Sequence, residues 1–118
     1  MSLTETHGLI SVWIGLKHQG QDVDLLKDLC GVDYYDIDFM ECSPAPPNQI
    51  ESVENLAKHL SYSESFGFEL CAAAENLGIH RIAWLVMLLN YSFAPQKATK
   101  QISESVIFLG VFKYDDND

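Results

Sequence analysis

The pattern of hydrophobic positions predicts strands toward both ends of the chain and helices in its middle. The stretch from Leu9 to Gly15 is rich in β-branched and aromatic residues and ends at a glycine, so we predict a strand followed by a turn. Residues 79–93 are apolar at both odd and even positions, and residues 106–114 show a similar pattern. Gly78 and Pro95 bound the first of these stretches, which favours a central strand buried on both faces. Periodicity alone is also compatible with a helix there.

Capping signals place three helices between these strands. Asp22 is expected to cap a short helix that ends at Gly31. Residues 37–40 are expected to form a short second strand, with a helical turn as the alternative. The proline-rich residues 43–47 are then predicted to form a connection, because proline has no amide hydrogen to donate. Two further helices are predicted from helical spacing. The first is capped by Asn48 and carries Ile50, Val53, Leu56, Ala57 and Leu60; the second is capped by Ser61, carries Phe66, Leu70, Ala73, Ala74 and Leu77, and ends at Gly78.

This order of elements predicts an α+β fold, an antiparallel sheet of about four strands with helices packed on one face. We expect one domain over residues 1–118, with flexible ends at 1–8 and 115–118. Trp13 is expected to be buried between the sheet and the helix that carries Phe66.

The last strand is expected to leave apolar surface uncovered. Strict alternation divides its side chains into two sets, Val106, Phe108, Phe112 and Tyr114 on one face and Ile107, Leu109 and Val111 on the other. One helical layer covers only one face of a sheet, so apolar residues on the second face would remain exposed. A homodimer formed through that face is therefore one expectation.

The charge of the chain narrows the classes of partner. It has 17 acidic residues against 7 lysines and arginines, a formal net charge of −10 at pH 7. Phosphates would be repelled, so we expect neither nucleic acid nor an anionic membrane surface as a direct partner. A basic partner would be attracted at long range, although acidity can also simply keep a small protein in solution.

The cysteines and the first residues indicate a reducing, cytoplasmic setting. Cys30, Cys42 and Cys71 are odd in number and show no C-x-x-C spacing. No basic segment followed by an apolar stretch opens the chain, so a secretory signal is not expected. The apolar run at residues 82–89 is far shorter than the ~20 residues of a membrane-spanning helix.

The sequence contains no recognisable catalytic, metal-binding or cofactor motif. Asp36 and Asp38 could supply oxygen ligands, but the glycine and glutamate that a calcium loop requires are replaced by Glu41 and Pro47. Cys71 lies in an alanine-rich segment, where a buried and inert thiol is more typical than a nucleophile. Phosphate-binding, dinucleotide-binding and hydrolase motifs are absent from the sequence. We therefore expect no enzymatic activity, no metal site and no cofactor.

An acidic and aromatic run is the strongest candidate for a binding surface. Its members are Asp33, Tyr34, Tyr35, Asp36, Asp38 and Glu41, and only Lys27 interrupts the acidic sign between Gln21 and this run's end. Carboxylates would steer a Lys/Arg-rich partner, and the two tyrosines would supply apolar contact area. The alternative is a solvated rim without a partner.

Three segments in order resemble the immunity protein 22 family of bacterial polymorphic toxin systems. They are Ser11-Val12-Trp13-Ile14-Gly15, Tyr35-Asp36-x-Asp38-Phe39 and residues 61–66, followed by two apolar strands, and the resemblance runs from about residue 10 to residue 114. It implies a small α+β protein that is encoded beside a toxin gene. Such a protein would neutralise a toxin, often a basic nuclease, by stoichiometric binding in the cytoplasm of the producing cell.

An acidic homo-oligomeric domain of another purpose, such as a small-molecule sensor, is the alternative function. The neighbouring genes discriminate between the two, because a toxin-like reading frame directly upstream favours immunity and a metabolic operon favours the sensor.

Overall fold

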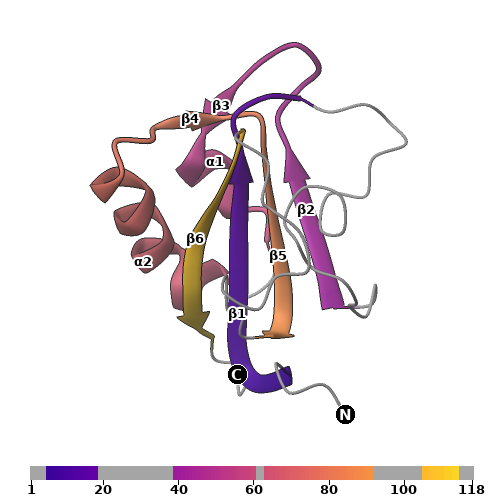
Figure 1. The fold of residues 1–118 in the computed structure, drawn as a ribbon, viewed down its shortest axis with the longest axis vertical. Helices are drawn as coiled ribbons and strands as arrows, with labels where there is room; N and C mark the ends of the chain where they lie inside the picture. Colours follow the sequence, from indigo (N-terminus) through magenta and orange to yellow (C-terminus); the bar gives the residue numbers. More distant parts are fainter. Residues whose placement is uncertain (1–4, 19–38, 61–62, 92–104, 115–118) are drawn as a thin grey trace.

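The computed structural model describes residues 5–18, 39–60, 63–91 and 105–114. Four strands, β1 (Glu5–Gly15), β2 (Met40–Pro44), β5 (Trp84–Tyr91) and β6 (Val106–Lys113), form one antiparallel sheet in the order β2-β5-β1-β6 (Figure 1). Two short strands, β3 (Glu51–Ser52) and β4 (Arg81–Ile82), pair separately. The helices α1 (Val53–Ala57) and α2 (Ser63–Asn76) contact β5 and β6, respectively. The predicted α+β fold with a four-stranded antiparallel sheet is confirmed.

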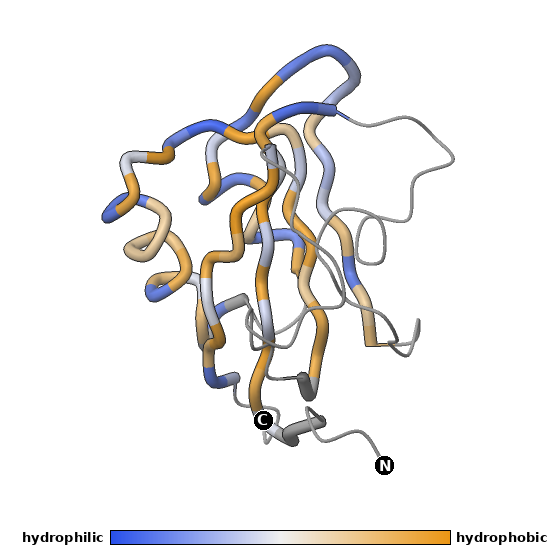
Figure 2. The backbone as a smooth tube through the Cα atoms, viewed as in Figure 1, coloured by the Kyte–Doolittle hydropathy of each residue, from blue (hydrophilic) through white to orange (hydrophobic). Residues whose placement is uncertain are grey.

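The prediction of a central strand within residues 79–93 is also confirmed. β5 lies between β2 and β1, and its side chains from Trp84 to Leu88 are all buried. Both faces of such a strand are buried, so residues at odd and at even positions are apolar. Figure 2 shows the resulting concentration of hydrophobic residues along β1, β5 and β6.

The helices and the sheet share one continuous core. This core contains alternate residues of β1 and β5 together with one face of α2. These residues are Ile10, Val12, Ile14, Leu85, Met87, Phe66, Leu70 and Ala74. Phe66 and Leu70 contribute most to holding α2 on the sheet, because burying a side chain of this size contributes on the order of 1.5–3 kcal/mol.

Trp13 is buried as predicted, but on the other face of the sheet. Its exposed fraction is 0%. Ile14 and Val12 point to the helices, so the period of two along a strand turns the indole of Trp13 away from Phe66. The ring instead lies beside Phe108 of β6, with 5.4 Å between ring centroids. The expectation that Trp13 packs between the sheet and α2 is therefore wrong.

The second face of the sheet is buried along β1 and β5, where Trp13, Trp84, Val86 and Leu88 are each at most 3% exposed in the single chain. The prediction concerned the last strand, and on β6 the residues Phe108 and Val111 of this face are half-buried. A homodimer through this face stays a prediction.

A β-bulge in β6 changes the two sets of side chains predicted for this strand. In the pairing with β1, Val12 lies opposite Gly110 and Trp13 opposite Phe108, so Leu109 is an extra residue. Gly110 has a φ of 145°, which residues with a side chain rarely adopt. Beyond the bulge the parity is reversed, and the set that faces the helices is Ile107, Leu109, Phe112 and Tyr114.

The start of α1 and the extent of β2 also differ from the prediction. The N-cap is Ser52, whose hydroxyl accepts a hydrogen bond from the Asn55 amide at 3.1 Å, whereas Asn48 lies in a turn with a φ of 62°. Glu51 and Ser52 pair with β4, so the helix cannot begin earlier. β2 continues to Pro44 within the proline-rich segment, because an edge strand tolerates proline at its end.

The end of α2 follows the prediction closely. Gly78 has a φ of 75°, and its amide donates to the Glu75 carbonyl at 2.9 Å. The Ile79 amide donates to the Ala74 carbonyl at 3.0 Å, and together these bonds form a Schellman motif. Leu77, predicted to belong to the buried face, is 57% exposed because it follows the last helical residue. The expected helix between Asp22 and Gly31 and the expected cap at Ser61 fall outside the described residues.

Candidate functional site

Of the predicted binding residues, only Glu41 lies in the described part of the chain. Asp33, Tyr34, Tyr35, Asp36 and Asp38 fall outside it. Glu41 is half-buried on the edge strand β2 and is paired with Met87. Met87 belongs to the core beneath the helices, so Glu41 lies on the helix-bearing side of the sheet.

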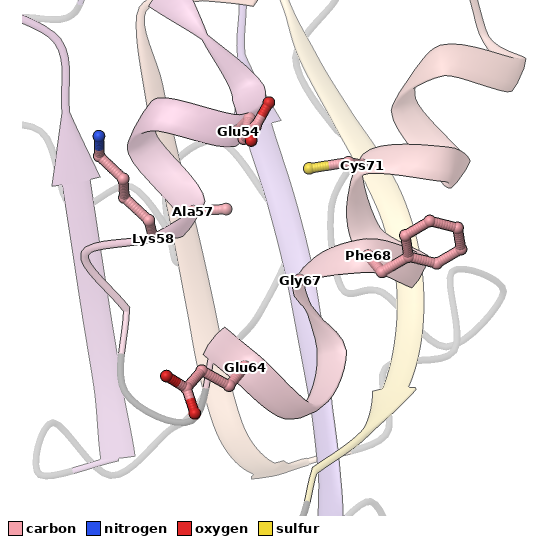
Figure 3. A pocket seen from close by; sticks show the side chains of 7 residues that line it. All are labelled: Glu54, Ala57, Lys58, Glu64, Gly67, Phe68 and Cys71. Carbon is pink, nitrogen blue, oxygen red and sulfur yellow. The ribbon is translucent and has the colours of Figure 1, made fainter.

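A cleft with a volume of about 460 Å³ lies between α1 and α2. We call it the interhelical cleft. It is lined by Glu54, Ala57, Lys58, Glu64, Gly67, Phe68 and Cys71. Figure 3 shows that the side chains of Ala57 and Cys71 point toward each other across the cleft, while the Phe68 ring points outward.

The placement of α1 follows from its small buried face. Val53, Leu56 and Ala57 are buried, which leaves Glu54 and Lys58 exposed at the cleft. A buried hydroxyl fastens the helix to the sheet, because Ser43 Oγ of β2 donates to the Leu56 carbonyl at 2.8 Å. A hydrogen bond sequestered from water is retained strongly, since breaking it would leave a buried polar group unsatisfied.

The side of α2 away from the core carries both acidic and apolar residues. Phe66 and Leu70 occupy the core face, so Glu64, Phe68 and Glu75 form a stripe on the other side of the helix, while the half-buried Cys71 is packed against the core. Phe68 in this stripe is 89% exposed. Gly67 and Cys71 are small, and this keeps the space between the helices open.

The electrostatic environment of the interhelical cleft is negative. Glu54 and Glu64 line the cleft, and the sequences of the two helices contain no lysine or arginine; Lys58, which follows α1 directly, also lines it. Burial is the main cause that raises the pKa of the Cys71 thiol, and the carboxylates of Glu54 and Glu75 raise it further. Both carboxylates therefore act on the interior of the cleft as well as on its rim.

A second hollow of about 410 Å³ lies on the other side of α1, lined partly by Pro44, Pro46 and His59. The adjoining loop is braced from two sides. His18 Nε2 lies 2.6 Å from the Gln49 carbonyl oxygen, and the Arg81 guanidinium donates to the Ile50 carbonyl at 3.0 Å. This loop therefore holds the exposed Ile50 in a fixed position at the surface.

The described residues contain no group of three or more histidines, cysteines or acids that could hold a metal ion. Among the same residues, no helix has the length and apolar character needed to cross a membrane. The thiols of Cys42 and Cys71 both have a pKa raised by burial, which disfavours the reactive thiolate at neutral pH.

Phe68 is the residue that sequence reasoning missed. A signal for it was present, since it lies two positions from Phe66 and therefore on the polar side of α2. A large aromatic residue on the polar side of an amphipathic helix is a candidate for contact with another molecule.

Comparisons with known proteins place the chain in a family. The family model described as Immunity protein 22 matches residues 23–115, which is most of the 118-residue chain. Searches of the curated proteins and of the solved structures gave no significant match. The matched region includes β2, both helices, β5 and β6, so it spans the acidic run as well as the interhelical cleft. The chain therefore belongs to the immunity protein 22 family, a membership that indicates a toxin-neutralising role.

Proposed function

We propose that this protein neutralises a cognate toxin by binding it stoichiometrically, without catalysis, in the cytoplasm of the producing cell. The observation that carries the proposal is the match of residues 23–115 to an immunity protein family. Inhibition by occupancy requires a stable complementary surface and no reactive group. The raised thiol pKa of both described cysteines is compatible with such a role.

The partner surface is proposed to be basic and of the nuclease type. A nuclease that grips phosphates presents Lys and Arg in its cleft, and an inhibitor with a net charge of −10 can occupy that cleft as a charge mimic. We propose that Asp33, Tyr34, Tyr35, Asp36, Asp38 and Glu41 take part in this contact. Charge would accelerate the encounter, and the tyrosines would slow dissociation.

Co-expression with the toxin domain encoded beside this gene tests the function. We expect growth of a bacterial host to be lost with the toxin domain alone and restored with the protein. In a titration of the purified components, toxin activity should fall linearly and reach zero near an equimolar ratio. Loss of toxin activity at a small fraction of the equimolar amount would indicate catalysis and contradict binding. Growth inhibition that persists at equal expression of both proteins would contradict neutralisation itself.

A further inference from the structure

The interhelical cleft has the composition of a docking site for a side chain that is apolar along its length and cationic at its end. Its inner surface is small and apolar, with Ala57, Gly67 and Cys71. Its rim carries the carboxylates of Glu54 and Glu64. Lys58 also lines the cleft, but Figure 3 shows its side chain pointing away from Cys71. Lys and Arg have a hydrocarbon stem and a charged head, so they match both parts of such a surface.

The glycine at position 67 also indicates that the interhelical cleft is a binding surface. A glycine in the interior of a helix is destabilising relative to alanine, and it normally requires a packing or conformational reason. Here a Cβ built on Gly67 would meet no atom within 4 Å, and the residue has ordinary helical backbone angles. Packing within this chain therefore does not explain the glycine, whereas open space at a binding surface does.

Phe68 supplies the third observation. Its ring is 89% exposed at the edge of the cleft, more than any other exposed large hydrophobic side chain described in the structure. Phe is enriched, together with Tyr and Trp, in the cores of protein–protein interfaces.

We propose, resting on the proposed function, that the interhelical cleft and Phe68 dock a toxin segment presenting Lys or Arg beside an apolar side chain. The stem of the cation would lie against Ala57, Gly67 and Cys71, with its head near Glu54 or Glu64. The neighbouring apolar side chain would contact the ring of Phe68. An acidic segment is disfavoured by Glu54 and Glu64 at the rim, and a second copy of this chain by mutual repulsion at a net charge of −10 each.

Two variants test the docking surface directly, with the purified toxin domain encoded beside this gene as the probe. Gly67→Leu places a larger side chain where an added Cβ meets no atom within 4 Å, and Phe68→Ala removes the exposed ring. We expect either change to weaken the dissociation constant about thirtyfold or more, the range of an interface hot spot. The thermal midpoint should be unchanged for Phe68→Ala and unchanged or higher for Gly67→Leu, so loss of binding would be separated from loss of folding.

Matched controls lie on the same helix or directly after it. Leu77→Ala shortens an exposed apolar side chain and Glu69→Gln removes an exposed charge, and neither residue lines the cleft. Both should bind as the wild type does. Replacing Glu54 and Glu64 together with glutamine should slow association severalfold, because rim charges act mainly on the association rate.

The outcomes separate this inference from the function on which it rests. A wild-type protein that does not bind the toxin domain would overturn the proposed function and the docking surface together. Wild-type binding with unchanged affinity in Gly67→Leu and Phe68→Ala would overturn the docking surface alone. Sedimentation showing a wild-type dimer that Gly67→Leu dissociates would overturn it as well, because the occupant would then be a second copy.

Discussion

At the scale of single residues, Gly15 and Trp84 show how one side chain dictates its neighbour across the sheet. The two residues are paired in register, β1 to β5, and the indole of Trp84 occupies the space that a side chain at position 15 would need. The indole nitrogen donates a hydrogen bond to the Lys17 carbonyl at 3.0 Å, which fixes the ring in this place. The glycine at the end of the apolar Trp13 segment is therefore a requirement of packing as well as a turn signal.

Replacing Gly15 with alanine should destabilise the protein. A Cβ there would overlap the Trp84 ring, so the ring must shift and its hydrogen bond must weaken. Overpacking of this kind costs about 1–3 kcal/mol of unfolding free energy, which urea denaturation would measure. Gly67→Ala is the matched control, since a Cβ at that position meets no atom within 4 Å. An unchanged denaturation midpoint for Gly15→Ala would show that the indole is free to move.

The Cys71 thiol should report the negative field of the interhelical cleft. Its pKa is raised by burial and then by Glu54 and Glu75. We expect slow alkylation by iodoacetamide at neutral pH in a protein whose other two cysteines are serine. Changing Glu54 and Glu75 to glutamine should lower the apparent pKa and speed the reaction, because only burial would remain as a cause. Glu69→Gln serves as the control; equal acceleration by it would contradict a local effect.

The raised pKa of the Cys71 thiol also makes the free energy of unfolding depend on pH. A thiol whose pKa is higher in the folded than in the unfolded state favours folding while it is protonated. This contribution is fully present below the unfolded-state pKa, and it is lost as the pH rises through the folded-state pKa.

At the scale of elements, α2 combines a well-formed C-terminal cap with an interior glycine. Gly78 is favourable because its positive φ closes the Schellman motif, whereas Gly67 occupies an ordinary helical position. The same residue type is therefore stabilising at one position and destabilising at the other.

Alanine at position 67 should stabilise the protein. The gain expected from helix propensity is about 0.5–1 kcal/mol in unfolding free energy, since no atom lies in the way of the added methyl group. Thermal and urea denaturation would measure it, with Gly78→Ala as the contrasting variant that should lose stability because of its φ of 75°. A destabilised Gly67→Ala variant would show that the backbone needs glycine there.

At the scale of the whole molecule, the net charge of −10 should govern how quickly a basic partner is found. Replacing Asp33, Asp36, Asp38 and Glu41 with their amides keeps shape and removes four charges. Association with the toxin should slow in this variant, and the wild-type association rate should fall as salt shortens the screening length toward ~8 Å at physiological ionic strength. Stopped-flow mixing across a salt series would measure both.

Thermal stability of the amide variant should barely change, because the proposed contact requires these carboxylates at the surface, where charges contribute little to folding. A larger effect on dissociation than on association would mean that one of these carboxylates is buried against the toxin. Unchanged rate and affinity would move the interface away from the acidic run, with the interhelical cleft as the next surface to test.

The candidate site could be predicted only in part. The acidic run was singled out from residue types alone, and its role in binding stays a prediction. Phe68 and the interhelical cleft were missed, because a cleft exists only between α1 and α2 and neither helix shows it alone. The pattern of α2 indicated which face is buried, and it therefore also contained the outward position of Phe68.

Local residue patterns were enough to predict the elements whose formation depends on residues close together in the chain. Apolar residues at both parities predicted the buried strand β5, helical spacing predicted α2, and a glycine with positive φ ended that helix where expected. Tertiary structure decided what depends on pairing between distant segments. Pairing of β3 with β4 set the start of α1, the bulge opposite Val12 reversed the parity of β6, and the period of two in β1 turned Trp13 away from the helices. Each of these outcomes depends on the register of one strand against another, and a one-residue change of register moves a side chain to the opposite face.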